Sequence, residues 1–264
     1  MRISAVLSIA GSDSSGGAGI QADIKTIAAH RLFAETAVTA LTAQNTLGVT
    51  GVFEASPAFV AEQIDAVFAD IPPAAVKIGM VSSAAIVEAI ADRLVAHNAR
   101  NVVVDPVMVA TSGANLAASD AVEALQARLF PLAQVITPNI PEAQVLAGRE
   151  LATEQQRESA ARELAARTGA HVLVKGGHGL DGANDVLAAP DGAVTWLRAP
   201  ALDTKNTHGT GCTLSSAIAC GLADGLTVEQ SVRSAKAYVT GALAANLTLG
   251  HGTGPLDHMW EYRD

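Results

Sequence analysis

The chain has 264 residues, enough for one large α/β domain or two small ones with a sizeable buried core. Hydrophobic residues make up 49% of the sequence but aromatic residues only 3%, so the core must consist mostly of Ala, Val, Leu and Ile. The formal net charge of −9 argues against a broad nucleic-acid-binding face, and no apolar run approaches the ~18 residues of a membrane span.

Apolar strands and helical patterns alternate along the chain. The strands that we expect cover residues 3–9, 37–42, 76–78, 102–105, 134–137, 172–175, 184–189 and 194–197. The helices that we expect contain residues 20–27, 57–68, 86–94 and 122–129, and further helices cover 153–167, 211–222 and 228–247. Phe59, Ile64 and Val67 are expected on the apolar face of the helix that Pro57 opens.

This alternation predicts an α/β fold in a single domain over residues 1–264. The sheet should be mainly parallel, with right-handed crossovers and helices on both faces. Residues 184–189 and 194–197 are expected to form an antiparallel pair around the turn Pro190-Asp-Gly192. Ligands of open α/β sheets bind outside the carboxyl ends of the strands. The residues that follow the strands are therefore the candidates for function.

The two cysteines, Cys212 and Cys220, lie eight positions apart in a predicted helix. The helical rise alone separates them by ~12 Å, which exceeds the roughly 7 Å Cα limit for a disulfide. Reduced thiols of this kind indicate a cytosolic protein. The start of the chain favours a first β-strand over a signal peptide, because serines interrupt its apolar run.

The stretch Gly209-Thr-Gly-Cys-Thr213 has the composition of a loop that leads into a helix. If Gly209 and Gly211 let the backbone turn sharply, successive N–H groups and the helix N-terminus form an anion-binding nest. The stretch is not a Walker A motif, because no Gly-Lys-Ser/Thr ends it, and it is not G-x-G-x-x-G. The alternative is an ordinary Gly-rich helix start.

A second glycine-rich loop, Gly11–Gly19, follows the first predicted strand. It could wrap a small substrate or serve only as a flexible connection. Asp23 could accept hydrogen bonds from a ligand, although a carboxylate at a helix start is also favoured by the helix dipole. The Gln44 amide offers the donors and acceptor that match the edge of an aminopyrimidine; the alternative is a polar loop residue.

Polar side chains also follow three of the later predicted strands. Asp105 ends an apolar strand, and Asn139 and Glu142 follow the next one. Their oxygens suit Mg²⁺, which takes few protein carboxylates and several phosphate or water oxygens; the alternative for residues 137–142 is a proline-punctuated turn into a helix. Lys175, followed by two glycines, could neutralise nucleotide phosphate or remain a solvated lysine.

His178 and His208 are weak candidates for a general base, because exposed loop histidines usually have no chemical role.

Seven motifs occur together and in a characteristic order. They are Ile9-Ala-Gly-Ser-Asp-Ser-Ser-Gly-Gly-Ala-Gly-Ile-Gln-Ala-Asp23, Ala40-Leu-Thr-Ala-Gln-Asn-Thr46, Lys77-Ile-Gly-Met80, Val104-Asp-Pro-Val-Met108, Thr137-Pro-Asn-Ile-Pro-Glu142, Val174-Lys-Gly-Gly-His178 and Asn206-Thr-His-Gly-Thr-Gly-Cys212. Over essentially its whole length the chain resembles the hydroxymethylpyrimidine kinase / phosphomethylpyrimidine kinase family of thiamine biosynthesis, which is ribokinase-like.

The resemblance implies a ribokinase-like three-layer α/β/α sandwich without the long β-lid of ribokinase. It implies a cytoplasmic homodimer that uses ATP and Mg²⁺, with no nucleic-acid or membrane partner. The enzyme would phosphorylate 4-amino-5-hydroxymethyl-2-methylpyrimidine to the monophosphate and then to the diphosphate.

The family pattern also implies residue roles. The pyrimidine would bind Gln44, in a pocket lined by Gly11, Asp23, Met80 and Val107. Metal and phosphates would bind Asp105, Asn139 and Glu142. ATP would meet Lys175, Gly176, Gly209 and Gly211. The catalytic set would be Lys175 with an anion hole of Gly209, Thr210, Gly211 and Cys212.

Ribokinase-like kinases generally carry a catalytic aspartate where this chain has Cys212. A neutral thiol would not repel the phosphate that acts as nucleophile in the second reaction, and phosphoryl transfer depends chiefly on positioning and charge stabilisation. For the first reaction, the helix N-terminus could lower the thiol pKa toward neutrality and make the thiolate a base. The third hypothesis is that Cys212 only fills space and shapes the nest.

Two rival functions stay open from the sequence. The nearer is pyridoxal or pyridoxine kinase, because that vitamin also carries a hydroxymethyl group; Gln44 and Met80 favour the pyrimidine. The more distant is a non-catalytic ligand sensor or a dinucleotide-binding oxidoreductase. The missing G-x-G-x-x-G counts against the oxidoreductase, and the joint presence of Asp105, Glu142 and Lys175 counts against the sensor.

Overall fold

The computed structural model describes residues 3–108, 119–177 and 182–263. Within these residues the strands are β1 (Ala5–Asp13), β2 (Phe33–Asn45), β3 (Gly48–Glu54), β4 (Ala75–Ile78), β5 (Val102–Val104), β6 (Val135–Ile136), β7 (His171–Val174), β8 (Asp185–Ala188) and β9 (Val194–Leu197). The helices are α1 (Gly19–Ala29), α2 (Pro57–Asp70), α3 (Ala84–Ala96), α4 (Ser119–Ala124), α5 (Ile140–Ala147), α6 (Glu154–Thr168), α7 (Thr210–Ala223) and α8 (Val228–Ala244). A π-helical turn, Leu125–Leu129, and a 3₁₀ turn, Phe130–Leu132, continue α4, and another 3₁₀ turn is Trp260–Tyr262.

All of these strands form one sheet in the order β3-β2-β1-β4-β5-β6-β7-β8-β9. Pairing is parallel from β2 through β1 and β4 to β7. The β2–β3, β7–β8 and β8–β9 pairs are antiparallel. The sheet is therefore mixed but mainly parallel, and the predicted antiparallel pair around Pro190–Gly192 is confirmed.

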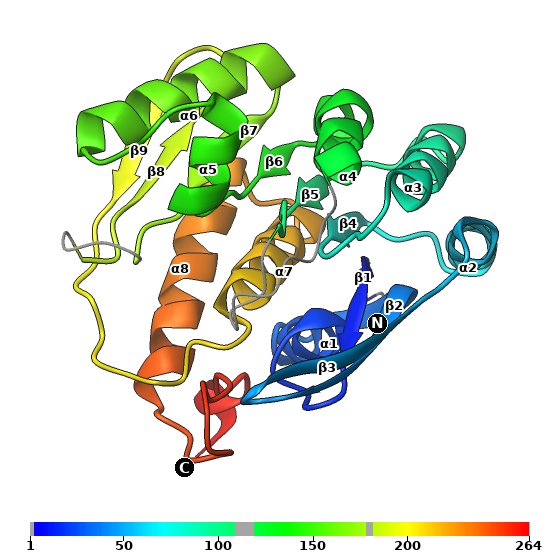
Figure 1. The fold of residues 1–264 in the computed structure, drawn as a ribbon, viewed down its shortest axis with the longest axis horizontal. Helices are drawn as coiled ribbons and strands as arrows, with labels where there is room; N and C mark the ends of the chain where they lie inside the picture. Colours follow the sequence, from blue (N-terminus) through cyan, green and yellow to red (C-terminus); the bar gives the residue numbers. More distant parts are fainter. Residues whose placement is uncertain (1–2, 109–118, 178–181, 264) are drawn as a thin grey trace.

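Helices cover both faces of the sheet and enclose two apolar cores (Figure 1). Successive residues of β5 show the division, because Val102 and Val104 belong to the core that α2, α3 and α6 cover, while Val103 belongs to the core that α1, α7 and α8 cover. A strand buried on both faces reads as a continuous apolar run. The predicted α/β/α sandwich is confirmed.

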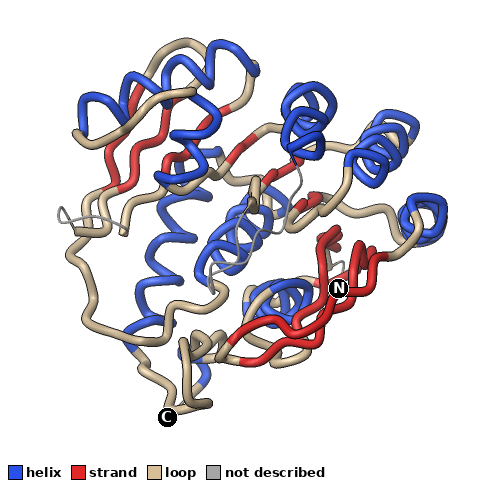
Figure 2. The backbone as a smooth tube through the Cα atoms, in the orientation of Figure 1, coloured by secondary structure: helices blue, strands red, loops and turns tan. Residues whose placement is uncertain are grey.

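The connection between β1 and α1 contains only residues 14–18. No long lid can be inserted there, in agreement with the expectation. A shorter hairpin is present elsewhere, because β2 continues beyond its pairing with β1 and turns back as β3 (Figure 2). The far end of this hairpin touches the C-terminal segment, because the Thr253 N–H donates to the Thr46 carbonyl at 3.1 Å.

Three expectations about elements are wrong. β1 continues to Asp13, so the strand includes residues assigned to the glycine loop. β3 was not expected, because most of its side chains are exposed and no apolar alternation marks it. Phe59 is 55% exposed, so Ile64 and Val60 instead anchor α2.

Within the described residues, no helix combines the length and apolar character that crossing a membrane requires.

Candidate active site

Two glycine-containing loops interlock at the carboxyl end of β1. Gly209 has a φ of +86°, and a Cβ at this position would overlap the carbonyl oxygen of Gly17. A Cβ at Gly17 would in turn overlap the ring of His208. Both positions exclude larger residues, because the backbone or ring of the opposite loop occupies the space. The loop of residues 14–18 and the loop of residues 206–209 therefore form one unit before α7.

Asp13 holds this unit together. Its carboxylate accepts hydrogen bonds from the N–H and hydroxyl of Ser15 and from the N–H groups of Gly17 and Ala18, at 2.8 to 3.1 Å. It also lies 2.7 Å from Nε2 of His208. Burial raises the pKa of Asp13, but the hydrogen bonds from His208 and Ser15 outweigh burial and hold that pKa at about 2.

His208 is not the exposed loop histidine that we expected. It is 7% exposed, its backbone N–H donates to the carbonyl of Gly254, and its ring lies between Asp13 and Gln44. Asp13 was also not predicted to be functional. The one sequence feature that could have indicated its role is a carboxylate two residues before a serine in a glycine-rich turn, where it can accept hydrogen bonds from the turn. His178 lies outside the described residues.

The anion loop, Gly209–Cys212, places the start of α7 against a buried ion pair. Gly209 is the N-cap, and the hydroxyl of Thr210 donates to the Thr207 carbonyl at 2.8 Å. A Cβ at Gly211 would lie 3.3 Å from both Oδ2 of Asp105 and Nζ of Lys175. The free N–H groups of a helix start attract anions, so this arrangement adds a lysine cation to such a site.

Lys175 and Asp105 form that ion pair at 2.7 Å. Asp105 is 1% exposed and also accepts from the hydroxyl of Thr137 at 3.1 Å. Burial lowers the pKa of Lys175, but Asp105 and Glu142 outweigh burial and raise it. The residues come together because Asp105 follows β5 and Lys175 follows β7, on either side of β6 in the sheet.

Asn139 and Glu142 lie at the same edge as the two halves of a capping box on α5. The Asn139 side chain accepts from the Glu142 N–H at 2.9 Å, and the Glu142 carboxylate accepts from the Asn139 N–H at 2.8 Å. Burial raises the pKa of Glu142 to about 7, although Lys175 opposes this rise. A β-bridge between Asn139 and Lys175 ties this segment to β7.

The protein oxygens at this edge fit Mg²⁺ only if phosphate or water oxygens supply the rest of its ligands. Among the described residues, no three His, Cys, Asp or Glu side chains gather closely enough to hold a metal by themselves. The Asp105 carboxylate nevertheless lies close enough to Glu142 to contribute to the raised pKa of Glu142. Two carboxylates supplemented by phosphate and water oxygens is the mode that Mg²⁺ commonly adopts.

Asp23 lies inside the protein beneath the anion loop. It is fully buried and accepts from Lys77 at 2.8 and 3.0 Å, from Ser8 at 2.6 Å and from Ser216 at 2.8 Å. Burial lowers the pKa of Lys77, but Asp23 and, more weakly, Cys212 outweigh burial and raise it. Asp23 therefore acts on the site indirectly, by pairing with Lys77, whose cation lies near Cys212. The sequence did not single out Lys77 as functional.

Cys212 is half-buried in the first turn of α7. Burial raises the pKa of its thiol to about 11 despite the nearby Lys77 cation, and the Gly19 N–H donates to the sulfur. The expectation that the helix N-terminus lowers this pKa toward neutrality is therefore wrong, and the thiol is protonated at neutral pH. Cys220 is a fully buried core residue, as expected.

The expected pyrimidine pocket is only partly assembled by direct contacts. A Cβ at Gly11 would overlap the terminal methyl of Met80, so these two residues pack together. Gln44 approaches His208, with 3.4 Å between Nε2 atoms. Val107 is half-buried in the turn after β5, where its N–H donates to the Asp105 carbonyl at 2.8 Å.

Gly176 was expected to meet nucleotide phosphate. Its N–H already donates to the Asp185 carboxylate at 2.7 Å, and a Cβ there would overlap the Asn184 carbonyl. Asp185 also pairs with Lys236 at 2.6 Å. The geometry thus gives Gly176 a role in joining β7 to β8 and leaves its N–H occupied.

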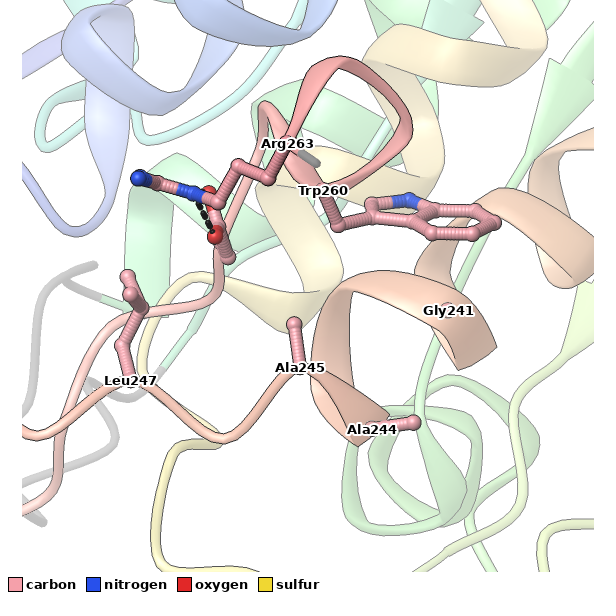
Figure 3. A pocket seen from close by; sticks show the side chains of 7 residues that line it. Gly241, Ala244, Ala245, Leu247, Trp260 and Arg263 are labelled. Atoms are coloured by element: carbon pink, nitrogen blue, oxygen red, sulfur yellow. Dashed lines mark hydrogen bonds and ion pairs between the residues drawn. The ribbon is translucent and has the colours of Figure 1, made fainter.

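A cavity of about 510 Å³ lies elsewhere, at the end of α8 (Figure 3). It is lined by Gly241, Ala244, Ala245, Leu247, Asp257, Trp260 and Arg263. None of the residues singled out from the sequence lines it. The glycine loops and the strand-end ion pair are therefore the better candidate for the reaction centre.

A mainly parallel α/β/α sandwich with a glycine-rich helix start beside a lysine at the strand ends is the arrangement of a ribokinase-like phosphotransferase. The phosphomethylpyrimidine kinase family matches residues 13–257. The chain belongs to this family and is a kinase.

Individual relatives agree. The chain is 52% identical to a hydroxymethylpyrimidine/phosphomethylpyrimidine kinase of Rhizobium meliloti, over 96% of each protein. It is 49% identical to the thiamine biosynthesis bifunctional protein ThiED of Geobacter sulfurreducens, over 98% of this chain, but it spans only about half (53%) of that protein. The structure is similar to an ADP complex of Bacillus subtilis pyridoxal kinase, with 35% identity, a TM-score of 0.91 and full coverage of both chains.

Proposed function

We propose that this chain transfers the terminal phosphoryl group of ATP twice in the pyrimidine branch of thiamine biosynthesis. The first acceptor is the hydroxymethyl group of 4-amino-5-hydroxymethyl-2-methylpyrimidine, and the second is the resulting monophosphate. Family membership supports this activity. The observation that carries it is the placement of the Lys175–Asp105 pair against Gly211, at the start of α7.

In the first step, the hydroxymethyl oxygen bonds to the γ-phosphorus while the bond from that phosphorus to the β–γ bridging oxygen breaks. The hydroxyl proton passes to an oxygen of the transferred phosphoryl group, and ADP leaves. Charge on the transferring group is stabilised by the N–H groups of the anion loop, Gly209–Cys212, and by the Lys175 cation. Lys77 adds a second, fully buried cation behind Cys212.

In the second step, the nucleophile is a phosphate oxygen that is already ionised, so no base is needed. A neutral Cys212 thiol suits that step, because a carboxylate at the same position would repel the incoming phosphate. The raised thiol pKa supports the neutral form. We therefore assign Cys212 to the shape and neutrality of the anion hole in both steps.

ATP and Mg²⁺ complete the proposal. A related kinase forms an ADP complex, and Lys175 would meet the nucleotide phosphates. Mg²⁺ would supply positive charge that offsets the negative charge of the nucleotide phosphates. Asp105 and Glu142 would hold it, and Asn139 would position Glu142 through the capping box.

The pyrimidine would bind at the Gln44 amide, with Gly11, Met80 and Val107 along its pocket. Asp23 would act from below by holding Lys77 in place. Pyridoxal is the second candidate substrate, because the structural similarity to a pyridoxal kinase extends over the full chain.

We also propose a homodimer in the cytoplasm. The hairpin of β2 and β3 exposes Leu41 (54%), Val52 (53%) and Phe53 (72%), and β3 is the outermost strand of the sheet. An exposed apolar strand edge is a candidate surface for association with a second copy. The two free thiols, Cys212 and Cys220, suit a reducing compartment.

Mass detection of products tests the catalytic proposal. The enzyme is incubated with ATP, Mg²⁺ and either the hydroxymethylpyrimidine, its monophosphate or pyridoxal. We expect mono- and diphosphate products from the pyrimidine, and diphosphate from the monophosphate. Phosphorylation of pyridoxal alone would overturn the assignment in favour of vitamin B6 salvage.

A further inference from the structure

The side-chain amide of Gln44 lies between Thr42 and His208. One end lies 3.1 Å from Oγ1 of Thr42, and the other lies 3.4 Å from Nε2 of His208. A carboxamide keeps nearly the same shape after a half-turn, so its neighbours decide which end is the oxygen. Both neighbours of Gln44 have only one consistent hydrogen-bonding state.

Asp13 determines the state of His208. The Asp13 carboxylate lies 2.7 Å from Nε2 of His208 and also accepts four hydrogen bonds from residues 15–18. An ionised carboxylate only accepts, so Nε2 must carry the hydrogen. That hydrogen is directed at Asp13, so Gln44 can share it only from the side, at 3.4 Å. An amide nitrogen there would place its own N–H groups against the Nε2–H, whereas the amide oxygen is attracted to it, so the end of Gln44 that faces Nε2 is the amide oxygen.

Ser12 determines the state of Thr42. The Thr42 hydroxyl lies 2.8 Å from the Ser12 carbonyl, which also only accepts. A hydroxyl has a single hydrogen. Thr42 donates it to the Ser12 carbonyl and therefore presents a lone pair to Gln44. The end of Gln44 that faces Thr42 must therefore donate, which means the amide nitrogen.

We infer that the Gln44 amide is held with its oxygen toward His208 and its nitrogen toward Thr42, and that His208 and Thr42 thereby determine which way round the pyrimidine ring binds. The two constraints arise independently, one from Asp13 and one from Ser12, and they select the same orientation. This inference rests on the proposed role of Gln44 in binding the ring.

The orientation has a direct consequence for the reaction. The amide keeps one oxygen lone pair and one N–H for a ligand, which pair with the amino group and the adjacent ring nitrogen of the pyrimidine. The hydroxymethyl carbon neighbours the amino-bearing carbon on the side away from that nitrogen. The hydroxymethyl group thus emerges on the side of His208, directly before Gly209 and the anion loop. The opposite amide orientation would turn it away.

The test uses the pyrimidine substrate and its analogue without the 4-amino group. His208→Phe keeps the ring volume but removes the donor, whereas His208→Gln keeps an N–H donor. We expect the wild type to prefer the amino compound by at least about tenfold in kcat/KM. That preference should be lost in His208→Phe through KM for the pyrimidine, retained in His208→Gln, and accompanied by an unchanged KM for ATP.

Thr42→Val is a second, nearly isosteric variant and should lose the same preference without involving His208. Survival of the preference in both His208→Phe and Thr42→Val would overturn the inference, as would a parallel rise in KM for ATP, which indicates general damage. His97→Gln serves as a matched control, because His97 pairs with Asp65 on α2, outside the site.

Gln44→Ala separates this inference from the proposed function. If Gln44→Ala leaves the amino preference intact, the role of Gln44 itself is wrong, and the inference is overturned with it. If Gln44→Ala removes the preference while His208→Phe and Thr42→Val keep it, only the orientation inference is overturned.

Discussion

Lys77 donates hydrogen bonds to both oxygens of the Asp23 carboxylate, at 2.8 and 3.0 Å, and neither side chain is exposed. The pair lies between strand β4, in the interior of the sheet, and helix α1, where water cannot screen it. Such a pair is costly to break from one side only, since the remaining charge stays buried without a partner.

Lys77→Met is therefore expected to lower the free energy of unfolding by about 3–5 kcal/mol. Urea denaturation of the purified variant measures this change. The double variant Lys77→Met/Asp23→Asn should recover most of the loss, because it removes both charges while Ser8 and Ser216 still find a partner. Equal stability of the single and double variants would contradict the ion-pair argument.

Gly209→Ala should cost more stability than a comparable glycine elsewhere. Gly209 and Gly225 have φ values of +86° and +81°, but only Gly209 faces a neighbouring carbonyl, that of Gly17. Gly225→Ala is expected to cost about 1–2 kcal/mol from backbone strain alone. Thermal unfolding compares the two variants. Gly209→Ala should also abolish phosphoryl transfer, while Gly225→Ala keeps it; equal melting temperatures would argue against interlocked loops.

The two reactions should respond differently to a negative charge at Cys212. Cys212→Ser keeps a neutral group and should retain both steps within about tenfold, because phosphoryl transfer relies on positioning and charge stabilisation. Cys212→Asp should raise KM for the monophosphate by more than about tenfold, with a smaller effect on the uncharged pyrimidine. Steady-state kinetics on each acceptor decide the matter. Loss of the first step in Cys212→Ser would instead indicate a thiolate base.

Glu35 on β2 should make stability fall as pH rises. Its carboxyl is buried with Oε2 unpartnered, and burial raises its pKa from 4.5 to about 7. Because the unfolded chain ionises first, the folded state binds more protons between these two values, so its stability decreases across that window. Glu35→Gln should thus gain about 1–2 kcal/mol over the wild type at pH 8 relative to pH 4.

Chemical denaturation at the two pH values checks the Glu35 prediction. Glu142 carries a raised pKa of about 7 as well, but it is present in both proteins and cancels in the comparison. An identical gain for Glu35→Gln at pH 4 and pH 8 would rule out ionisation of Glu35 as its cause.

The parallel core of the fold could be predicted because its strands are buried on both faces. Val102–Val104 is an unbroken β-branched run, and nothing else accommodates such a run so well. The meeting of Asp105 with Lys175 was also predictable, since both follow parallel strands and such strands end at one edge. Local pattern and topology were enough for these features.

The remaining features depend on partners far away in the sequence. Asp13 and His208 are 195 residues apart, so neither reveals that it is buried with the other. Lys77 interrupts an apolar strand, and the strand itself gives no reason for a buried lysine. The reason is the contact with Asp23, which lies far away in the sequence. β3 was not predicted because an edge strand with exposed faces has no pattern of buried apolar residues. Each of these residues is explained by tertiary contact rather than by its neighbours in the chain.

The interlocking of the loops at Gly17 and Gly209 also has a consequence for synthesis. At about 5–20 residues per second, a ribosome needs about 10–40 s to add the 195 residues that separate Asp13 from His208. The N-terminal loop must wait that long for the partner that closes it. A nascent chain can therefore assemble most of its sheet before it can phosphorylate anything, and any chain that stalls before Gly209 remains inert however well its first half folds.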